Sequence, residues 1–330
     1  MNELIEPLIT MVISLVALLV SSNIAIKNSV KLSELTGLGK SRIGFTFVAT
    51  LTSLPELAVT LFATISGEAV VSIGNVLGSN VANISLIIGL GLLLYALKLK
   101  KKELVTIKFK PEELDMFYLG IFTASVIPIL LISFLPASQI VGGLLIVIYI
   151  YYTYKIIAKR ELLLEELEEP REASKSKKTL ITCIVLAILG IIGVALSADF
   201  LVDSTVKLAL LLEVSPSIIS ATIIAIGTSF PELFISIQSM LAGHTDLAFG
   251  NVVGSNFTNI TLIFGITLLL SPVRLNIKVF SDLVTFSILA NILLWYLMHR
   301  GGLGWREGLY LLILYSLFLS SIMGILVFPE

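Results

Sequence analysis

Two glutamates, Glu56 and Glu232, end matching motifs inside long apolar segments. The motifs read Thr-Ser-Leu-Pro-Glu at 52–56 and Thr-Ser-Phe-Pro-Glu at 228–232, and they are 176 residues apart. At the same offset, Gly-Asn-Val-Leu-Gly-Ser-Asn at 74–80 matches Gly-Asn-Val-Val-Gly-Ser-Asn at 250–256. An acidic side chain in a bilayer core costs about 2.5 kcal/mol or more, so the repeated pair is a candidate for function.

Oxygen-bearing residues accompany both glutamates at helical spacing. Ala49, Thr52, Ser53 and Glu56 fall on one face of a helix, and Pro55 leaves carbonyls of the preceding turn without their usual amide partner. The second motif repeats this arrangement, and the next apolar segment of each half adds a Ser and an Asn. The candidate cation ligands are Glu56, Thr52, Ala49, Ser53, Ser79 and Asn83 in the first half and Glu232, Thr228, Ala225, Ser229, Ser255 and Asn259 in the second.

This set of ligands suits a hard cation. Carboxylate, amide, hydroxyl and carbonyl oxygens are the ligands that Ca²⁺ and Na⁺ prefer. Two carboxylates also neutralise one divalent ion where unpaired charge is costly, which favours Ca²⁺ over a lone monovalent ion. The alternative is that two protonated glutamates only cross-link helices by hydrogen bonds. One cysteine and two histidines provide neither a disulfide framework nor a transition-metal cluster.

The composition places these residues in a membrane. Hydrophobic residues make up 56% of the 330 and charged residues 14%, and the net charge of -1 gives no indication of a nucleic-acid partner. A span needs roughly 20 apolar residues as helix. We therefore expect an all-α integral membrane protein with ten transmembrane helices, near 5–25, 43–66, 70–96, 116–135, 137–157, 179–203, 217–242, 246–271, 279–298 and 306–328.

Charge and repeat together predict the topology. With the N-terminus outside, nineteen of the 22 Lys and Arg residues fall on the inside, so both termini should lie outside the cell membrane. Each half has five spans, an odd number, so the second copy enters the membrane from the opposite side and the repeats are inverted. We expect a first five-helix repeat at 1–158, a cytoplasmic linker at 159–178 and a second five-helix repeat at 179–330.

The two motifs resemble the repeats of the cation/Ca²⁺ exchanger superfamily, and most of all those of the sodium/calcium exchangers. The resemblance covers about 50 residues of each half around the motifs, and the ten-span layout extends it to nearly the whole chain. It implies that Glu56 and Glu232 bridge Ca²⁺ and that backbone oxygens of Thr52 and Thr228 complete the site. It further implies flanking Na⁺ positions lined by Ala49, Ser53, Ser79, Asn83, Ala225, Ser229, Ser255 and Asn259.

The chain departs from the family pattern at two positions. Leu51 stands where the core normally has glycine, as Gly227 does in the second copy. Asn259 occupies a position that is often aspartate in sodium/calcium and potassium-dependent exchangers. The loss of that acid argues against cotransport of K⁺.

These observations predict a secondary-active antiporter that exchanges Ca²⁺ for Na⁺ by alternating access. We expect the first and sixth spans to move against a core made of the two motif-bearing hairpins. No nucleophile–histidine pair or zinc motif is present, so we expect no enzyme activity, no cofactor and no obligatory protein partner besides the transported ions and the bilayer. Ca²⁺/H⁺ exchange, with the same glutamates carrying protons, is the alternative within transporters, and a cation channel is the alternative from another class.

Overall fold

The described part of the chain is built from helices. The structure is a computed structural model, and it describes residues 2–36, 52–99, 111–133, 138–164, 177–270, 277–300 and 303–324. The helices of the first half are α1 (Asn2–Thr36), α3 (Leu54–Ile65), α4 (Ala69–Val81), η1 (Ala82–Ile88), α5 (Gly89–Leu99), α6 (Pro111–Ser133) and α7 (Ser138–Leu164). Those of the second half are α8 (Lys177–Leu211), α9 (Pro216–Ile219), η3 (Ser220–Ile224), α10 (Ala225–Thr228), α11 (Phe230–Ala242), α12 (Thr245–Thr258), η4 (Asn259–Ile263), α13 (Phe264–Leu270), α14 (Ile277–His299) and α15 (Trp305–Ile322).

Several of these helices can cross a bilayer. Within the described residues, five are long and apolar enough, namely Leu4–Asn28, Ala69–Lys98, Thr179–Leu211, Leu247–Leu270 and Ser281–His299. The stretches Pro216–Thr228 and Phe230–Ala242 add a sixth if the bent pair is one span. Shorter apolar helices cover Leu54–Ile65, Phe117–Ile127 and Gln139–Tyr154. The expectation of an all-α multi-pass membrane protein is confirmed, and the number of ten spans stays a prediction.

Polar and apolar side chains are distributed as expected for a protein in lipid. Ile13 of α1 and Ile140 of α7 are 62% and 70% exposed, whereas Asn75 and Asn251 are 0% and 5% exposed. Apolar side chains face outward because the surrounding solvent is hydrocarbon, and buried amides and hydroxyls find partners inside the bundle.

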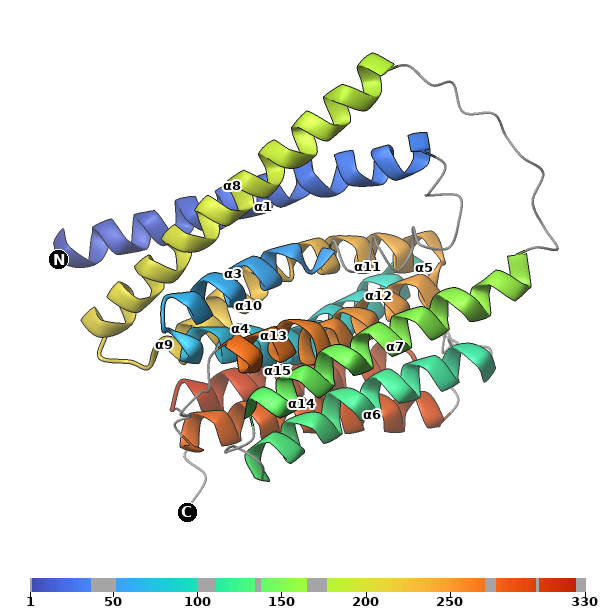
Figure 1. Cartoon of the computed structure of the whole chain (residues 1–330). Coiled ribbons are helices and arrows are strands. Elements are labelled where there is room, and N and C mark those ends of the chain that lie inside the picture. The colour runs from blue at the N-terminus through green and yellow to red at the C-terminus, as the bar shows by residue number, and fades with distance from the viewer. Residues whose placement is uncertain are drawn as a thin grey trace.

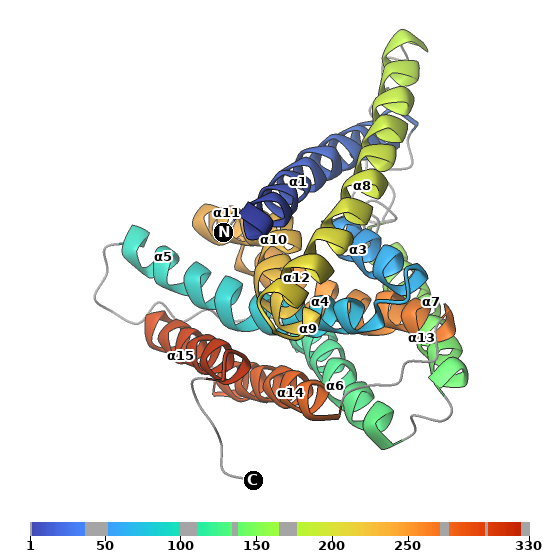
Figure 2. The same ribbon diagram turned by 90° about the vertical axis from the view of Figure 1, so that its left-hand side faces the viewer.

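The long helices α1 and α8 form a pair that stands to one side of the other helices (Figures 1 and 2). Small residues let the two backbones come close, because a Cβ on Gly190 of α8 would lie 2.6 Å from the amide nitrogen of Ala25. Leu15 of α1 also reaches the rest of the bundle, and its Cδ1 would lie 2.5 Å from a Cβ on Gly227. The pair thus packs directly against α10.

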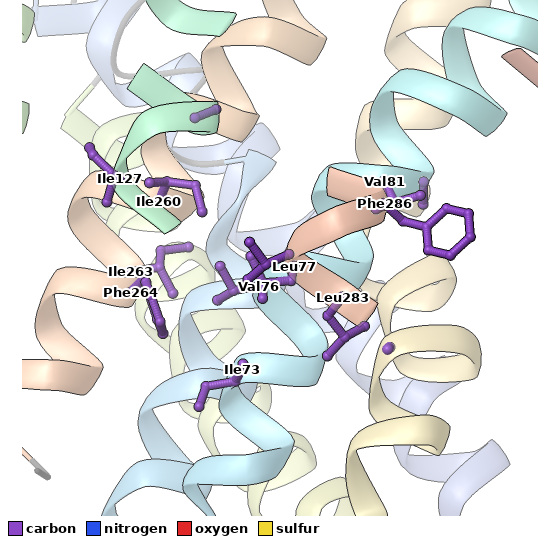
Figure 3. Packing of buried hydrophobic residues seen from close by; sticks show 14 of the residues in the cluster. Ile73, Val76, Leu77, Val81, Ile127, Ile260, Ile263, Phe264, Leu283 and Phe286 are labelled. Atoms are coloured by element: carbon purple, nitrogen blue, oxygen red, sulfur yellow. The ribbon is translucent and has the colours of Figure 1, made fainter. Parts of the chain in front are cut away.

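The remaining helices surround α4 and α12, the central helices of the two motif-bearing hairpins. Figure 3 shows Leu77 of α4 among apolar side chains of α13 and α14, and all of these are buried. The turn between α3 and α4 and the turn between α11 and α12 lie at opposite ends of the bundle (Figure 1). Lys98 at the end of α5 donates to the Leu241 carbonyl at the end of α11, 2.6 Å away, so these two helix ends lie together.

Glycines bring α4 against the second half of the chain. A Cβ on Gly74 would lie 2.7 Å from the Ser217 carbonyl oxygen, and one on Gly78 would lie 2.6 Å from Ala221 Cα. The obstructing atoms belong to the backbone and cannot move aside cheaply. These contacts hold the α3–α4 hairpin against the segment that leads into the second motif.

Candidate functional site

Each glutamate lies in the first turn of a helix that begins directly after a helical interruption, at Ser53 in the first half and at Ser229 in the second. Ser53 and Ser229 precede the two helices with similar backbone angles, φ -83° and ψ 14° against φ -79° and ψ 11°. A proline at the second helical position then starts α3 and α11. In the second half the interruption makes an angle of 47° between the stretches Pro216–Thr228 and Phe230–Ala242. The sequence predicted that proline only loosens carbonyls of a continuous helix, whereas the structure begins a new helix at this point.

Each of the two carboxylates accepts a hydrogen bond from a serine in the opposite half of the chain. Ser53 Oγ donates to Glu232 Oε1 over 3.2 Å, and Ser229 Oγ donates to Glu56 Oε1 over 2.9 Å. Glu56 and Glu232 are 1% and 0% exposed. Each motif therefore supplies a glutamate and also the hydroxyl that orients the other glutamate.

The second oxygen of each carboxylate is left without a donor. Within the described residues, Glu56 Oε2 and Glu232 Oε2 are buried and have no hydrogen-bond partner. No Lys or Arg of the described residues forms an ion pair with either glutamate, and the ion pair between Lys207 and Asp203 is exposed on α8. Buried carboxylates with free acceptor oxygens and no cationic partner are suited to an added cation.

One asparagine in each hairpin donates to the backbone carbonyl of its glutamate. Asn75 Nδ2 donates to the Glu56 carbonyl at 3.3 Å, and Asn251 Nδ2 donates to the Glu232 carbonyl at 3.4 Å. The oxygen of Asn75 accepts a bond of 3.1 Å from the hydroxyl of Thr228. These bonds position the backbone at both motifs, and the repeated Gly-Asn sequence was the signal for this role.

Four further asparagines form a chain of hydrogen bonds between α4–η1 and α12–η4, which we call the asparagine quartet. Asn83 Nδ2 donates to Asn256 Oδ1 at 2.9 Å, and Asn259 Nδ2 donates to Asn80 Oδ1 at 3.1 Å. Asn256 Nδ2 donates to the Asn80 carbonyl at 3.1 Å. Asn83 Oδ1 and Asn259 Oδ1 have no hydrogen-bond partner among the described residues. The quartet thus holds two further acceptor oxygens that have no donor.

The two equivalent serines on α4 and α12 have different hydrogen-bond partners. Ser255 Oγ donates to Glu232 Oε1 over 3.2 Å, whereas Ser79 Oγ donates to the Ala225 carbonyl over 3.4 Å. Thr52 and Thr228 are fully buried beside their motifs. Ala49 and Leu51 lie outside the described residues.

The helices that carry Asn83 and Asn259 change their winding at these residues. η1 (Ala82–Ile88) and η4 (Asn259–Ile263) are π-helical turns inside otherwise α-helical stretches, as is η3 (Ser220–Ile224) before the second motif. Such turns are uncommon and are found frequently at functional sites. No feature of the sequence analysis predicted these turns.

Comparison with known proteins identifies the family. The family model described as sodium/calcium exchanger protein matches residues 6–158 and 182–324. The chain belongs to the sodium/calcium exchanger family. This confirms the resemblance drawn from the motifs and identifies the protein as a membrane transporter of the Ca²⁺/cation antiporter class.

Two proteins similar to this exchanger match nearly its whole length. The sodium/calcium exchanger MaX1 of Methanosarcina acetivorans is 28% identical, with 94% of this chain and 96% of the relative covered. A solved structure of the sodium-calcium exchanger NCX_Mj, soaked with Na⁺ and Sr²⁺, has a TM-score of 0.61 at 26% identity and covers 95% of this chain and 98% of its own. The H⁺/Ca²⁺ exchanger CAX shares the fold, with a TM-score of 0.72 at 16% identity over 97% of this chain and 87% of its own.

The hydrogen bonds of the exchanger gather most of the predicted ligands into two groups, one around the carboxylates and one in the asparagine quartet. The carboxylates meet the serines across the two halves, and the quartet contains Asn83 and Asn259. Within the described residues, no three His, Cys, Asp or Glu side chains gather in a form that could hold a metal. Any cation would therefore rely on two carboxylates together with neutral oxygens, a set that suits Ca²⁺ and Na⁺. Asn80, Asn256, Thr60 and Ser236 were not predicted, although each of the two pairs recurs at the repeat offset.

Proposed function

We propose that this exchanger moves Ca²⁺ against Na⁺ at the site between the two motifs. The observation that carries the proposal is the pair of buried carboxylates, Glu56 and Glu232, each with one oxygen held by a serine of the other half and one oxygen without a donor. Two negative charges in a low-dielectric interior match one divalent cation. Backbone oxygens of Thr52 and Thr228 would complete the Ca²⁺ position.

Sodium would occupy positions that flank the Ca²⁺ position. The free amide oxygens of Asn83 and Asn259 lie in the quartet, and hydroxyls of Ser79 and Ser255 lie nearby on the same helices. Na⁺ needs several oxygen ligands, whereas a proton needs only a base. The neutral oxygens around the glutamates therefore favour Na⁺ over H⁺ as the coupling ion.

The proposed transport cycle rests on two inverted five-helix repeats with ten spans and both termini outside. The opposite positions of the α3–α4 and α11–α12 turns support this arrangement (Figure 1). The pair α1 and α8 packs against α3, where Leu18, Leu201 and Val59 share a buried apolar cluster, and α1 also touches α10 at Gly227. Movement of this pair would therefore expose the site alternately to the two sides.

Transport by the purified protein in vesicles tests the coupling ion. Vesicles loaded with Na⁺ and diluted into Na⁺-free buffer should accumulate radioactive Ca²⁺ at equal pH on both sides and with the membrane potential clamped. Vesicles without protein provide the control. Acid should inhibit uptake because protonation removes the carboxylate ligands.

The opposite result would overturn the proposal. If a pH gradient alone drives uptake and a Na⁺ gradient does nothing, the protein exchanges Ca²⁺ for H⁺. If Ca²⁺ only equilibrates and is never concentrated, the protein is a channel, because a passive pore cannot concentrate Ca²⁺ under a clamped potential.

A further inference from the structure

Four further buried polar atoms belong to η1, α14 and α15 and take no part in the hydrogen bonds of the ion site. Ser85 Oγ, Ser287 Oγ, Asn291 Oδ1 and the Tyr315 hydroxyl are buried and have no hydrogen-bond partner among the described residues. The four residues are 0%, 1%, 0% and 6% exposed. Ser85 follows Asn83 by two residues, so it points to nearly the opposite side of the helix from the asparagine quartet.

The contacts between α15 and the η1–α5 stretch place Tyr315 near Ser85. A Cβ on Gly308 would lie 2.9 Å from Leu92 Cβ, and one on Gly89 would lie 2.9 Å from Leu312 Cγ. As α15 advances from Gly308 to Leu312, its partner recedes from Leu92 to Gly89, so the two helices are antiparallel. Tyr315 is three residues beyond Leu312, so at about 1.5 Å per residue it lies level with Leu86, the residue next to Ser85.

The contacts of α14 bring the other two residues to the same level. Phe286 lies next to Val81 (Figure 3), and its ring centroid is 5.6 Å from that of Phe318. Ser287 follows directly, and Asn291 is one turn further along the same face. Asn291 Nδ2 donates to the Ser287 carbonyl at 2.9 Å, which leaves its Oδ1 turned away from that bond.

We propose that these four groups form a buried water site behind η1. A buried polar atom without a partner costs about 1–3 kcal/mol, and a stable fold does not retain four such atoms on adjoining helices without compensation. One or two water molecules, each with two to four polar partners, satisfy all of them.

Water fits this group better than a cation. Three of the four groups are hydroxyls, and each must place its hydrogen on an acceptor, which a cation cannot provide. No acidic side chain occurs in η1, between Leu283 and Met298 of α14, or between Gly308 and Ile322 of α15. A cation here would therefore be uncompensated in a low-dielectric interior.

The site would also serve the π-helical winding of η1. A π-helical turn displaces backbone groups from their usual α-helical partners, and ordered water beside Ser/Thr side chains supplies substitutes within a membrane. The water site thus supports the segment that carries Asn83 from the side opposite the quartet.

The sign of a stability change tests the water site. Tyr315→Phe removes only the hydroxyl, so if water bonds to it, Tm in detergent should fall by about 2–4 °C, and Ser85→Ala should act in the same direction. If the hydroxyl has no partner, its removal should leave Tm unchanged or raise it, because an unsatisfied buried group is lost. Tyr310→Phe is the matched control, since Tyr310 is 50% exposed on the same helix.

A double variant shows whether the groups share one site. The effects of Ser85→Ala and Tyr315→Phe should be less than additive, because the first change already disturbs the water that the second would lose. Fully additive losses would overturn a shared site. The Tm differences should also be the same in Na⁺, Li⁺ and choline buffers. A difference that appears in Na⁺ alone would show that the site binds a sodium ion and would overturn the water site.

Discussion

At the scale of single residues, the site depends on an exchange between the two halves, in which each motif orients the carboxylate of the other. Ser53 bonds to Glu232 and Ser229 bonds to Glu56. Each glutamate therefore accepts one hydroxyl bond that forms only when the other half is correctly packed, and Glu232 Oε1 also accepts a bond from Ser255 of its own half. This reciprocity makes the two carboxylates a single unit, so that neither half should bind Ca²⁺ by itself.

The first prediction follows from the charge of this unit. Glu56→Gln or Glu232→Gln should weaken Ca²⁺ binding by roughly 30-fold or more, because removing one partner of a buried charge pair costs about 2–5 kcal/mol. The protein should still fold, since a neutral amide is easier to bury than a carboxylate. Radioactive Ca²⁺ uptake into vesicles measures the first effect, and Tm in detergent measures the second.

Asp199→Asn is the control for this prediction, because Asp199 is an exposed acid on α8. It should transport Ca²⁺ like the unchanged protein. Near-normal flux in both glutamine variants would show that Ca²⁺ binds elsewhere.

Residues of the site were predictable where the repeat marks them. Glu56, Ser53 and their counterparts were found because a polar motif is conspicuous within an apolar segment. The second copy of the motif at a fixed offset also excludes a chance match. Asn80 and Asn256 belong to the same repeated sequence but were missed as partners of the site. Asn80 follows Ser79 directly, so on an α-helix its side chain points about 100° away from that of Ser79, and Asn256 is related to Ser255 in the same way. The π-helical turns that follow then change the direction in which later side chains point.

At the scale of elements, the two hairpins differ in the way their helices are joined. In the first half, Thr64 Oγ1 lies 2.8 Å from Ser72 Oγ, donates to the Thr60 carbonyl at 2.7 Å and lies 3.5 Å from Thr267 Oγ1. The residues at the repeat offset from Thr64, Ser72 and Thr267 are Met240, Ala248 and Gly91. There Met240 packs on Gly91 by dispersion alone. At this position the first hairpin is joined by hydroxyls and the second by apolar packing, although Asn251 Nδ2 still donates to Ser236 Oγ at 3.0 Å between α11 and α12.

The second prediction tests the hydroxyl junction. Thr64→Val keeps the shape of the side chain but removes bonds to two other helices, so the free energy of unfolding should fall by about 1–2 kcal/mol. Thermal unfolding in detergent measures the change. Thr123→Val is the control, because Thr123 Oγ1 bonds to the Leu119 carbonyl of its own helix at 2.8 Å. Equal shifts in the two variants would mean that the junction contributes nothing beyond a local bond.

The third prediction concerns the close approach of α4 to the second half. Gly78→Ala should destabilise the protein by about 1–3 kcal/mol, because the added methyl meets backbone atoms of Ala221. Gly143→Ala should be neutral or stabilising by up to about 1 kcal/mol, because a Cβ on Gly143 of α7 meets no atom within 4 Å. Chemical or thermal unfolding of both variants checks the contrast. A Gly78→Ala protein as stable as Gly143→Ala would remove the packing argument.

Helix positions were predicted well where apolar length sets them and poorly where it does not. The span expected at 70–96 corresponds to Ala69–Leu99, and that at 279–298 corresponds to Ile277–His299. The first helix runs over Asn2–Thr36 rather than 5–25, because hydrophobicity marks the hydrocarbon core and a helix can continue into polar sequence beyond it. The break at Ser229 is marked in the sequence only by Pro231, and the π-helical turns leave no mark in the apolar pattern.

At the scale of the whole molecule, the direction of each half is decided by where its hairpin turn lies. The α3–α4 turn and the α11–α12 turn are at opposite ends of the bundle in Figure 1. The bond from Lys98 to the Leu241 carbonyl places the end of α5 beside the α11–α12 turn. Lys98 belongs to a basic loop that the charge distribution puts on the cytoplasmic side. The α11–α12 turn should therefore be cytoplasmic and the α3–α4 turn external.

The last prediction turns this into a labelling experiment. Cysteines are introduced one at a time at exposed turn residues, as Ser66→Cys and His244→Cys, in a background in which the buried Cys183 is replaced by alanine. A membrane-impermeant maleimide should label position 66 in intact cells and position 244 only after permeabilisation. Pro170→Cys, in the expected cytoplasmic linker, should behave like position 244, and Glu330→Cys like position 66. Labelling of both turns from the same side would mean that the two repeats have the same orientation in the membrane. The inverted arrangement, and with it the symmetry of the reciprocal serine–glutamate bonds, would then be wrong. Reversed labelling at all four positions would keep the repeats inverted but turn the protein over, so that an outward Na⁺ gradient would act on the opposite face.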